Sequence, residues 1–171
     1  MVLLRFNSSY RRDFLRRNYP ADAVVVYDQM GQTPFYAGPT MRFVDSWGLT
    51  DRTIGRFYFG RWKRRNALLR AYDGVASEAV KLAFGERRDE ISETEALNYV
   101  FGLNPDLILI HKVAIAADDT GIPARLIQDP KLTDAYELRY TLAGVVMVYE
   151  RRDAPRKQGP DVPPGLAVEE H

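Results

Sequence analysis

Short runs of apolar residues, separated by turn-forming residues, predict the strands of a β-sheet. The first run, Ala-Val-Val-Val-Tyr, is apolar throughout and rich in valine, as in a strand buried in a largely parallel sheet. The run from 136 to 142 instead alternates apolar and polar residues, and Ala143-Gly144 can turn the chain back into a hairpin partner. About five strands are expected, at 23–27, 40–44, 106–111, 136–142 and 145–150.

Apolar residues at helical spacing predict helices between these strands. A first helix follows Ser8-Ser9, either of which can cap it. A second begins after Thr50-Asp51, and helix-prone sequence continues from 61 to 82. A third opens with the capping box formed by Ser92 and Glu95.

The order of these elements favours one α/β fold. Helix, strand, strand, long helical region, strand and hairpin predict a three-layer sandwich around a mixed, partly parallel sheet with an antiparallel C-terminal hairpin. From Asp153 onward the composition changes to proline, glycine and charge. We therefore expect residues 1–152 to form a single domain and 153–171 to be a disordered tail.

Composition excludes several classes of site. The chain has no cysteine, so it has no disulfide, thiolate nucleophile or cysteine-bound metal. It lacks glycine-rich nucleotide motifs, and His111 is the one histidine within the predicted domain. We expect no metal and no cofactor, and interpret His111 as a structural or surface histidine. No apolar run has the length of a transmembrane helix, and no signal peptide is apparent.

Three aspartates fall at or just after the ends of predicted strands. Asp28 follows the first strand, Asp45 ends the second, and Asp51 precedes the next helix. Carboxylates at such loops can bind sugar hydroxyls or act in acid–base chemistry. A structural role is the favoured alternative, with Asp45 capping the turn at Gly48 and Asp51 capping the helix.

Basic and aromatic residues alternate from 52 to 70, without an acidic residue among them. The basic ones are Arg52, Arg56, Arg61, Lys63, Arg64, Arg65 and Arg70, and the aromatic ones are Phe57, Tyr58, Phe59 and Trp62. This segment could lie on an anionic membrane, bind phosphate, or form a helix with solvated arginines. The arginines of the first helix, Arg11 among them, could extend it into one basic face. The net charge of +1 disfavours nucleic acid as a partner.

The segment from Asp22 to Arg56 resembles a domain of known membrane enzymes. It is similar to the start of the C-terminal soluble domain of polytopic bacterial glycosyltransferases of the GT-C superfamily, the arabinofuranosyltransferase- and mannosyltransferase-like proteins. The matching residues are Asp22-Ala23-Val24-Val25-Val26-Tyr27, Gly31, Pro34-Phe35-Tyr36-Ala37-Gly38, Val44-Asp45-Ser46-Trp47-Gly48-Leu49-Thr50-Asp51 and Ile54-Gly55-Arg56. Gly55 replaces the usual alanine. With 104–109 and 148–152, the resemblance covers about residues 10 to 152.

The resemblance implies an accessory domain that is not catalytic alone, because the family's catalytic aspartate lies in a loop absent from this sequence. The domain would lie on the periplasmic or exoplasmic side of the inner membrane, beside a membrane-embedded transferase portion or an anionic membrane surface. Contacts with a glycan acceptor or lipid-phosphate donor would come from Asp28, Tyr36, Asp45, Asp51 and Arg56. Contacts with membrane or phosphate would come from Arg52, Arg61, Trp62, Lys63, Arg64 and Arg65.

Two other hypotheses remain open. The alternative function is a free-standing α/β binding module for a sugar or a phosphorylated metabolite, and its location would be cytoplasmic. A soluble enzyme that uses the strand-end carboxylates is the third hypothesis.

Overall fold

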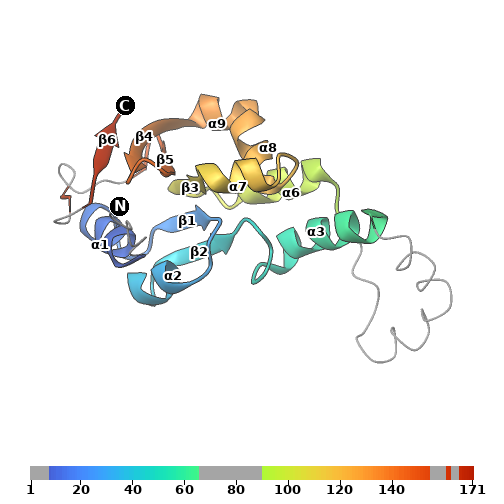
Figure 1. Cartoon of the computed structure of the whole chain (residues 1–171), viewed down its shortest axis with the longest axis horizontal. Helices are drawn as coiled ribbons and strands as arrows, with labels where there is room; N and C mark the ends of the chain where they lie inside the picture. The colour runs from blue at the N-terminus through green and yellow to red at the C-terminus, as the bar shows by residue number, and fades with distance from the viewer. Residues whose placement is uncertain (1–7, 66–89, 155–160, 163–165) are drawn as a thin grey trace, which may run out of the picture.

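A computed structural model describes residues 8–65, 90–154, 161–162 and 166–171. The helix-prone sequence predicted up to residue 82 lies outside this description beyond residue 65, as does Arg70. Figure 1 shows the order of the elements along the chain and their arrangement around one sheet.

Six strands form a mixed sheet in the order β2-β1-β3-β5-β4-β6. The first three in this order are parallel and the others antiparallel to their neighbours. The strands are β1 (Val24–Tyr27), β2 (Arg42–Asp45), β3 (Leu107–His111), β4 (Tyr136–Leu142), β5 (Val146–Arg151) and β6 (Val168–Glu170). The predicted α/β fold, with its partly parallel sheet and antiparallel C-terminal hairpin, is confirmed.

Helices cover both faces of the sheet. The described helices are α1 (Ser8–Asn18), α2 (Gln32–Ala37), α3 (Arg52–Arg65), α6 (Glu93–Gly102), α7 (Lys112–Ala117), α8 (Ile122–Gln128) and α9 (Pro130–Ala135). On one face, Phe14 and Leu15 of α1 and Ala37 of α2 pack with Val25 and Tyr27 of β1.

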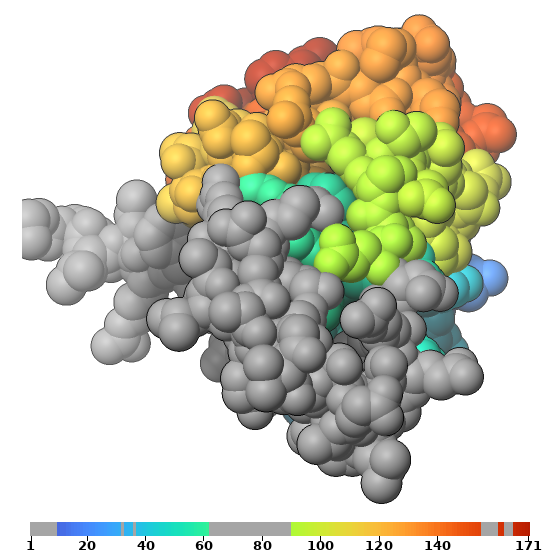
Figure 2. Space-filling view, turned by 90° about the vertical axis from the view of Figure 1, so that its right-hand side faces the viewer, coloured from blue at the N-terminus to red at the C-terminus, as the bar shows by residue number. Residues whose placement is uncertain are grey.

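The opposite face carries a second apolar core. Ile54 of α3, Val100 of α6 and Leu126 of α8 pack there with Val26 of β1 and Ile108 of β3. In the space-filling view of Figure 2, atoms of α3 are visible between those of α6 and α7. Because successive residues of β1 point into different cores, the strand is buried on both sides, as its continuous apolar sequence predicts.

Local sequence explains two of the element boundaries. Ser92 and Glu95 make both hydrogen bonds of the predicted capping box at the start of α6. The hairpin turn has a positive φ at Ala143 (50°) and Gly144 (69°), and the Val145 N–H donates to the Leu142 carbonyl. The two positive φ values and this hydrogen bond are the features of a type I′ turn.

Three segments differ from the sequence prediction. The connection between β3 and β4 contains α7, α8 and α9, where the predicted order of elements has no helix. The loop expected between β1 and β2 contains α2, whose six residues are too few to show apolar periodicity. The segment expected as a disordered tail after residue 152 includes β6, which pairs with β4 as a sixth strand. Leu166 and Val168 account for this strand, because both pack against the core on the α1 face.

Two glycines fix the loop between β2 and α3. Gly48 has φ of 69°, and a Cβ there would lie 2.4 Å from the Gly55 nitrogen. A Cβ on Gly55 would lie 2.8 Å from the Gly48 carbonyl oxygen. The loop therefore packs directly on the first turn of α3, which requires glycine at both positions.

Gly48→Ala should destabilise the protein more than Gly144→Ala does. Both glycines have φ of 69°, but a Cβ on Gly144 meets nothing within 4 Å. Gly144→Ala should cost about 1 kcal/mol of strain, and Gly48→Ala about 3 kcal/mol or more, because its methyl group also overlaps the α3 backbone. Urea unfolding of the two variants measures both values, and equal losses would contradict the close loop–helix contact.

Candidate functional site at the carboxyl edge of the parallel strands

The strand order reverses at β1. The chain passes from β1 to β2 on one side and later returns to β3 on the other side of β1. In open α/β sheets, ligands bind outside the carboxyl ends of the strands at such a switch point. Asp28 follows β1 and His111 ends β3, so both residues lie there.

The carboxylate of Asp28 joins the ends of these two strands. Its Oδ2 accepts a hydrogen bond from the backbone N–H of His111 at 2.7 Å, and its Oδ1 lies 2.5 Å from His111 Nδ1. Both residues are buried, with exposed fractions of 4% for Asp28 and 3% for His111. This burial agrees with the structural alternative for His111 and not with the surface one, and its specific partner was not predicted.

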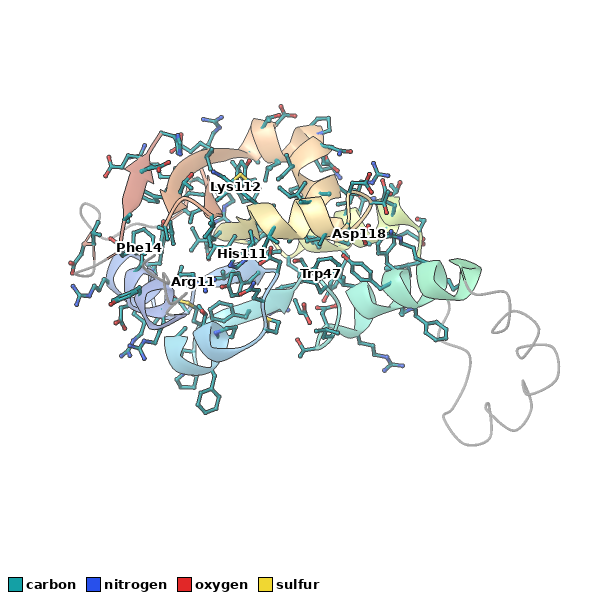
Figure 3. All side chains as sticks on the ribbon, in the orientation of Figure 1. Arg11, Phe14, Trp47, His111, Lys112 and Asp118 are labelled. Atoms are coloured by element: carbon teal, nitrogen blue, oxygen red, sulfur yellow. The ribbon has the colours of Figure 1, made fainter. Side chains whose placement is uncertain are left out.

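Arg11 reaches this pair from α1. It lies three residues before Phe14 on the face of the helix that packs on the sheet, and it is 8% exposed. Its Nη1 group donates to His111 Nε2, to the Tyr27 hydroxyl at 2.8 Å and to Gln29 Oε1 at 3.5 Å. Figure 3 shows Arg11 beside His111. We call Arg11, His111 and Asp28 the Arg–His–Asp cluster.

The hydrogen-bond partners of His111 determine which ring nitrogen carries the proton. A guanidinium group only donates, so His111 Nε2 accepts from Arg11, and the ring proton lies on Nδ1, facing Asp28. Burial raises the pKa of Tyr27, so its hydroxyl stays protonated and accepts from Arg11 through a lone pair. Both ring nitrogens of His111 are therefore occupied, and the ring orients Arg11.

The other two predicted aspartates hold local structure. Asp45 is 1% exposed and accepts hydrogen bonds from the backbone N–H groups of Trp47 and Thr50 at 2.9 and 2.7 Å. Asp51 accepts from the second and third N–H groups of α3 and from the Tyr99 hydroxyl. These contacts match the structural alternative favoured from the sequence, and a ligand contact for either residue stays a prediction.

Arg61 is engaged within the fold. Its Nη1 and Nη2 donate to Asp118 Oδ2 and Oδ1 at 3.0 and 3.1 Å, and Nη1 also donates to the Thr120 carbonyl at 2.8 Å. Its guanidinium carbon lies 5.8 Å from the Tyr58 ring centroid, and the Tyr58 hydroxyl accepts from Ile122 N–H. Figure 3 labels Asp118, the partner that ties α3 to the loop before α8.

The remaining predicted contacts are only partly described. Arg52 is exposed and Arg56 half-buried on α3. The side chains of Tyr36, Trp62, Lys63, Arg64 and Arg65 lie outside the described part of the structure, so their contacts stay predictions.

The single basic face considered from the sequence is not formed by α1 and α3. The two helices pack in different cores, on opposite faces of the sheet. Arg11 in particular points toward the sheet instead of into solvent.

Sequence reasoning missed the pairing of Arg11 with His111. One available signal was an arginine on the apolar face of α1, and another was a histidine closing an otherwise apolar strand. Neither signal identifies a partner 100 positions away in the chain.

Asp118→Asn should lower stability in a pH-dependent way. Burial opposes ionisation of Asp118, but hydrogen bonds from Arg61 and Thr120 outweigh it and lower the carboxyl pKa to about 2. The folded state therefore binds the proton less readily, so this contribution is complete above the ordinary pKa of roughly 3.9 and is lost as pH falls toward 2.

Chemical denaturation at several pH values measures this effect. Near pH 6 we expect a loss of about 1–2 kcal/mol, which shrinks between about pH 4 and 2. Asp119→Asn, at the exposed neighbouring aspartate, is the control and should show no comparable loss. A loss that stays constant with pH would contradict the ionised Asp118–Arg61 pair.

Comparisons with known proteins give a family but no activity. No curated protein and no solved structure matches the chain significantly. None of the described helices is long and apolar enough to span a bilayer. Nothing in these comparisons bears on the GT-C resemblance, which stays a prediction. Residues 5–162 match the family described as "Domain of unknown function (DUF8728)". The chain therefore belongs to the DUF8728 family.

Proposed function

We propose that this domain binds a small polar metabolite at the carboxyl edge of β1 and β3. The observation that supports this function is the Arg–His–Asp cluster. Its three side chains come from α1, the end of β1 and the end of β3, and they are buried together where the strand order reverses. This is the position at which open α/β sheets bind ligands.

A contribution to folding stability does not by itself explain why these buried residues are charged and polar. Removing charged groups from water costs several kcal/mol for each ion, roughly, and apolar residues of similar volume often serve a core equally well or better. Polar groups that converge at the edge of an apolar core are instead typical of ligand sites.

The hydrogen bonds favour binding over catalysis. His111 accepts from Arg11 at Nε2 and faces Asp28 at Nδ1, so neither nitrogen is available as a general base while the cluster is intact. A fixed guanidinium, by contrast, is suited to recognition. We therefore favour a binding module over the enzyme hypothesis.

A ligand screen tests this proposal. Neutral sugars, sugar phosphates and small carboxylates are added separately, and at least one class should raise the melting temperature. The same ligand should shift the amide NMR signals of Gln29 and Lys112, which flank Asp28 and His111 in the sequence. Asp28→Asn should abolish this binding, because it releases the His111 ring.

Asp22→Asn is the matched control for the screen. Asp22 is exposed and precedes β1, at the opposite end of the strand from Asp28. This variant should bind as the wild type does. A folded Asp28→Asn variant with unchanged affinity, or the absence of any ligand in the three classes, would refute the site.

Contact with an anionic membrane, which the GT-C resemblance implies, is a second proposal. The loop after β2 presents Leu49 with 84% of its surface exposed, and the exposed Arg52 follows three residues later. Asp45 and the close contact of Gly48 with Gly55 hold this loop in one conformation. A rigid loop that carries an apolar tip beside a cation suits the surface of anionic lipid.

Vesicle sedimentation tests the membrane proposal. The protein should bind vesicles that contain phosphatidylglycerol and not vesicles of phosphatidylcholine alone. Leu49→Ser should reduce the partition coefficient about tenfold, since it removes a side chain whose burial is worth roughly 1.5–3 kcal/mol. Val113→Ser, at a 62% exposed position on α7, is the control and should bind as the wild type does. Equal effects of the two variants would count against the loop.

A further inference from the structure

Arg11 differs from other arginines in the described structure. Arg61 contacts the Asp118 carboxylate at 3.0 Å, and Arg151 contacts that of Asp106 at 3.1 Å. Arg11 is 8% exposed, yet within the described residues its hydrogen bonds go to an imidazole, a phenol and an amide, and to no carboxylate. Among the described residues, this buried cation therefore has no directly bound counter-ion.

Burying an arginine in this way lowers the stability of the fold unless an anion binds beside it. Buried charges are usually paired, because removing an ion from water is unfavourable. The nearest acid in the network is Asp28, but both of its oxygens are bound to His111, and the imidazole ring separates it from Arg11. Asp28 therefore orients the ring more than it neutralises the guanidinium.

The donors of Arg11 are used unevenly. Its three hydrogen bonds to described residues all leave from Nη1. Its Nε and Nη2 groups donate to none of the residues that the structure describes. These two groups form one edge of the planar guanidinium, with the spacing that binds two oxygens of a phosphate or carboxylate at once.

The side chain of Gln29 contacts Nη1, outside this edge. Gln29 is exposed, and its hydrogen bond with Arg11 is long, at 3.5 Å. An anion at the Nε–Nη2 edge would leave the hydrogen bonds of Nη1 to His111 and Tyr27 in place, and these bonds hold the guanidinium.

We propose that Arg11 binds the oxyanion group of a small metabolite, a phosphate or a carboxylate, through its Nε–Nη2 edge. This inference rests on the proposed binding function and names the ligand class for the same site. His111 and Asp28 act as positioning residues, because they fix the plane of the guanidinium and do not contact the anion. The bound anion supplies a counter-ion that none of the described residues provides by direct contact.

The first experiment uses the wild-type chain. Inorganic phosphate, malonate and glucose are titrated separately at constant ionic strength, and the Nε–H signal of Arg11 is followed by NMR, with Arg11→Lys providing its assignment. Phosphate or malonate should shift this signal in a saturable way, and glucose should not. Comparing phosphate with malonate tells a phosphoester ligand from a carboxylate.

The second experiment uses variants. Arg11→Gln should weaken binding of the preferred anion at least about tenfold, and Arg11→Lys should weaken it less, because lysine keeps the charge and loses the two-point geometry. Arg17→Gln is the control. Arg17 lies on the same helix and makes an exposed ion pair with Asp161, so its loss should leave the affinity unchanged.

The outcomes separate this inference from the proposed function. If glucose shifts the Gln29 and Lys112 amides and neither anion does, the site stands and the oxyanion assignment is overturned. If the anions bind with equal affinity to Arg11→Gln, the assignment is also overturned. If no tested ligand, including the wider screen, shifts those amides, both proposals fail. If Arg11→Gln does not fold, the titration of the wild-type Arg11 Nε–H signal tests the oxyanion assignment: a saturable shift supports it, and no shift overturns it.

Discussion

The two hydrogen bonds that His111 donates to Asp28 organise the carboxyl edge of this domain. They join β1 to β3 at the point where the strand order reverses, and they fix the plane of the imidazole ring. The ring in turn receives Arg11, which ties α1 to the same edge. Without the carboxylate, the ring would lose its orientation, and the guanidinium would lose the partner that holds it below the surface.

The three aspartates at the ends of strands have different structural roles, although their side chains are identical. Asp45 and Asp51 bind backbone groups within five positions of themselves, so their roles follow from local sequence. Asp28 binds a residue 83 positions away, and its role follows from the topology of the sheet. The DUF8728 family assignment does not indicate a function. The contacts of Asp28 indicate where a ligand would bind, and the proposed function rests on them.

The sequence was informative wherever its signals were local. Apolar periodicity located β1 to β5 to within two residues, and the capping box of Ser92 marked the start of α6. The sequence did not predict α2, α7 and α9, which are too short for clear periodicity. It also did not predict β6, which pairs with β4 and packs Val168 against the core. The partner of Arg11 could not be predicted, because an arginine on a mostly polar helix gives the same pattern whether it is solvated or buried.

The parallel pairing of β1 with β3 also has a kinetic consequence. β1 lies at the centre of the parallel half, but one of its neighbours comes from residues 107–111. Contacts between distant residues form slowly, because the entropy of closing the intervening loop is lost before the contact stabilises the chain. During synthesis, the apolar faces of α1, β1 and β2 would therefore stay exposed until the ribosome has released β3. This half of the domain is the part most prone to aggregate before folding is complete.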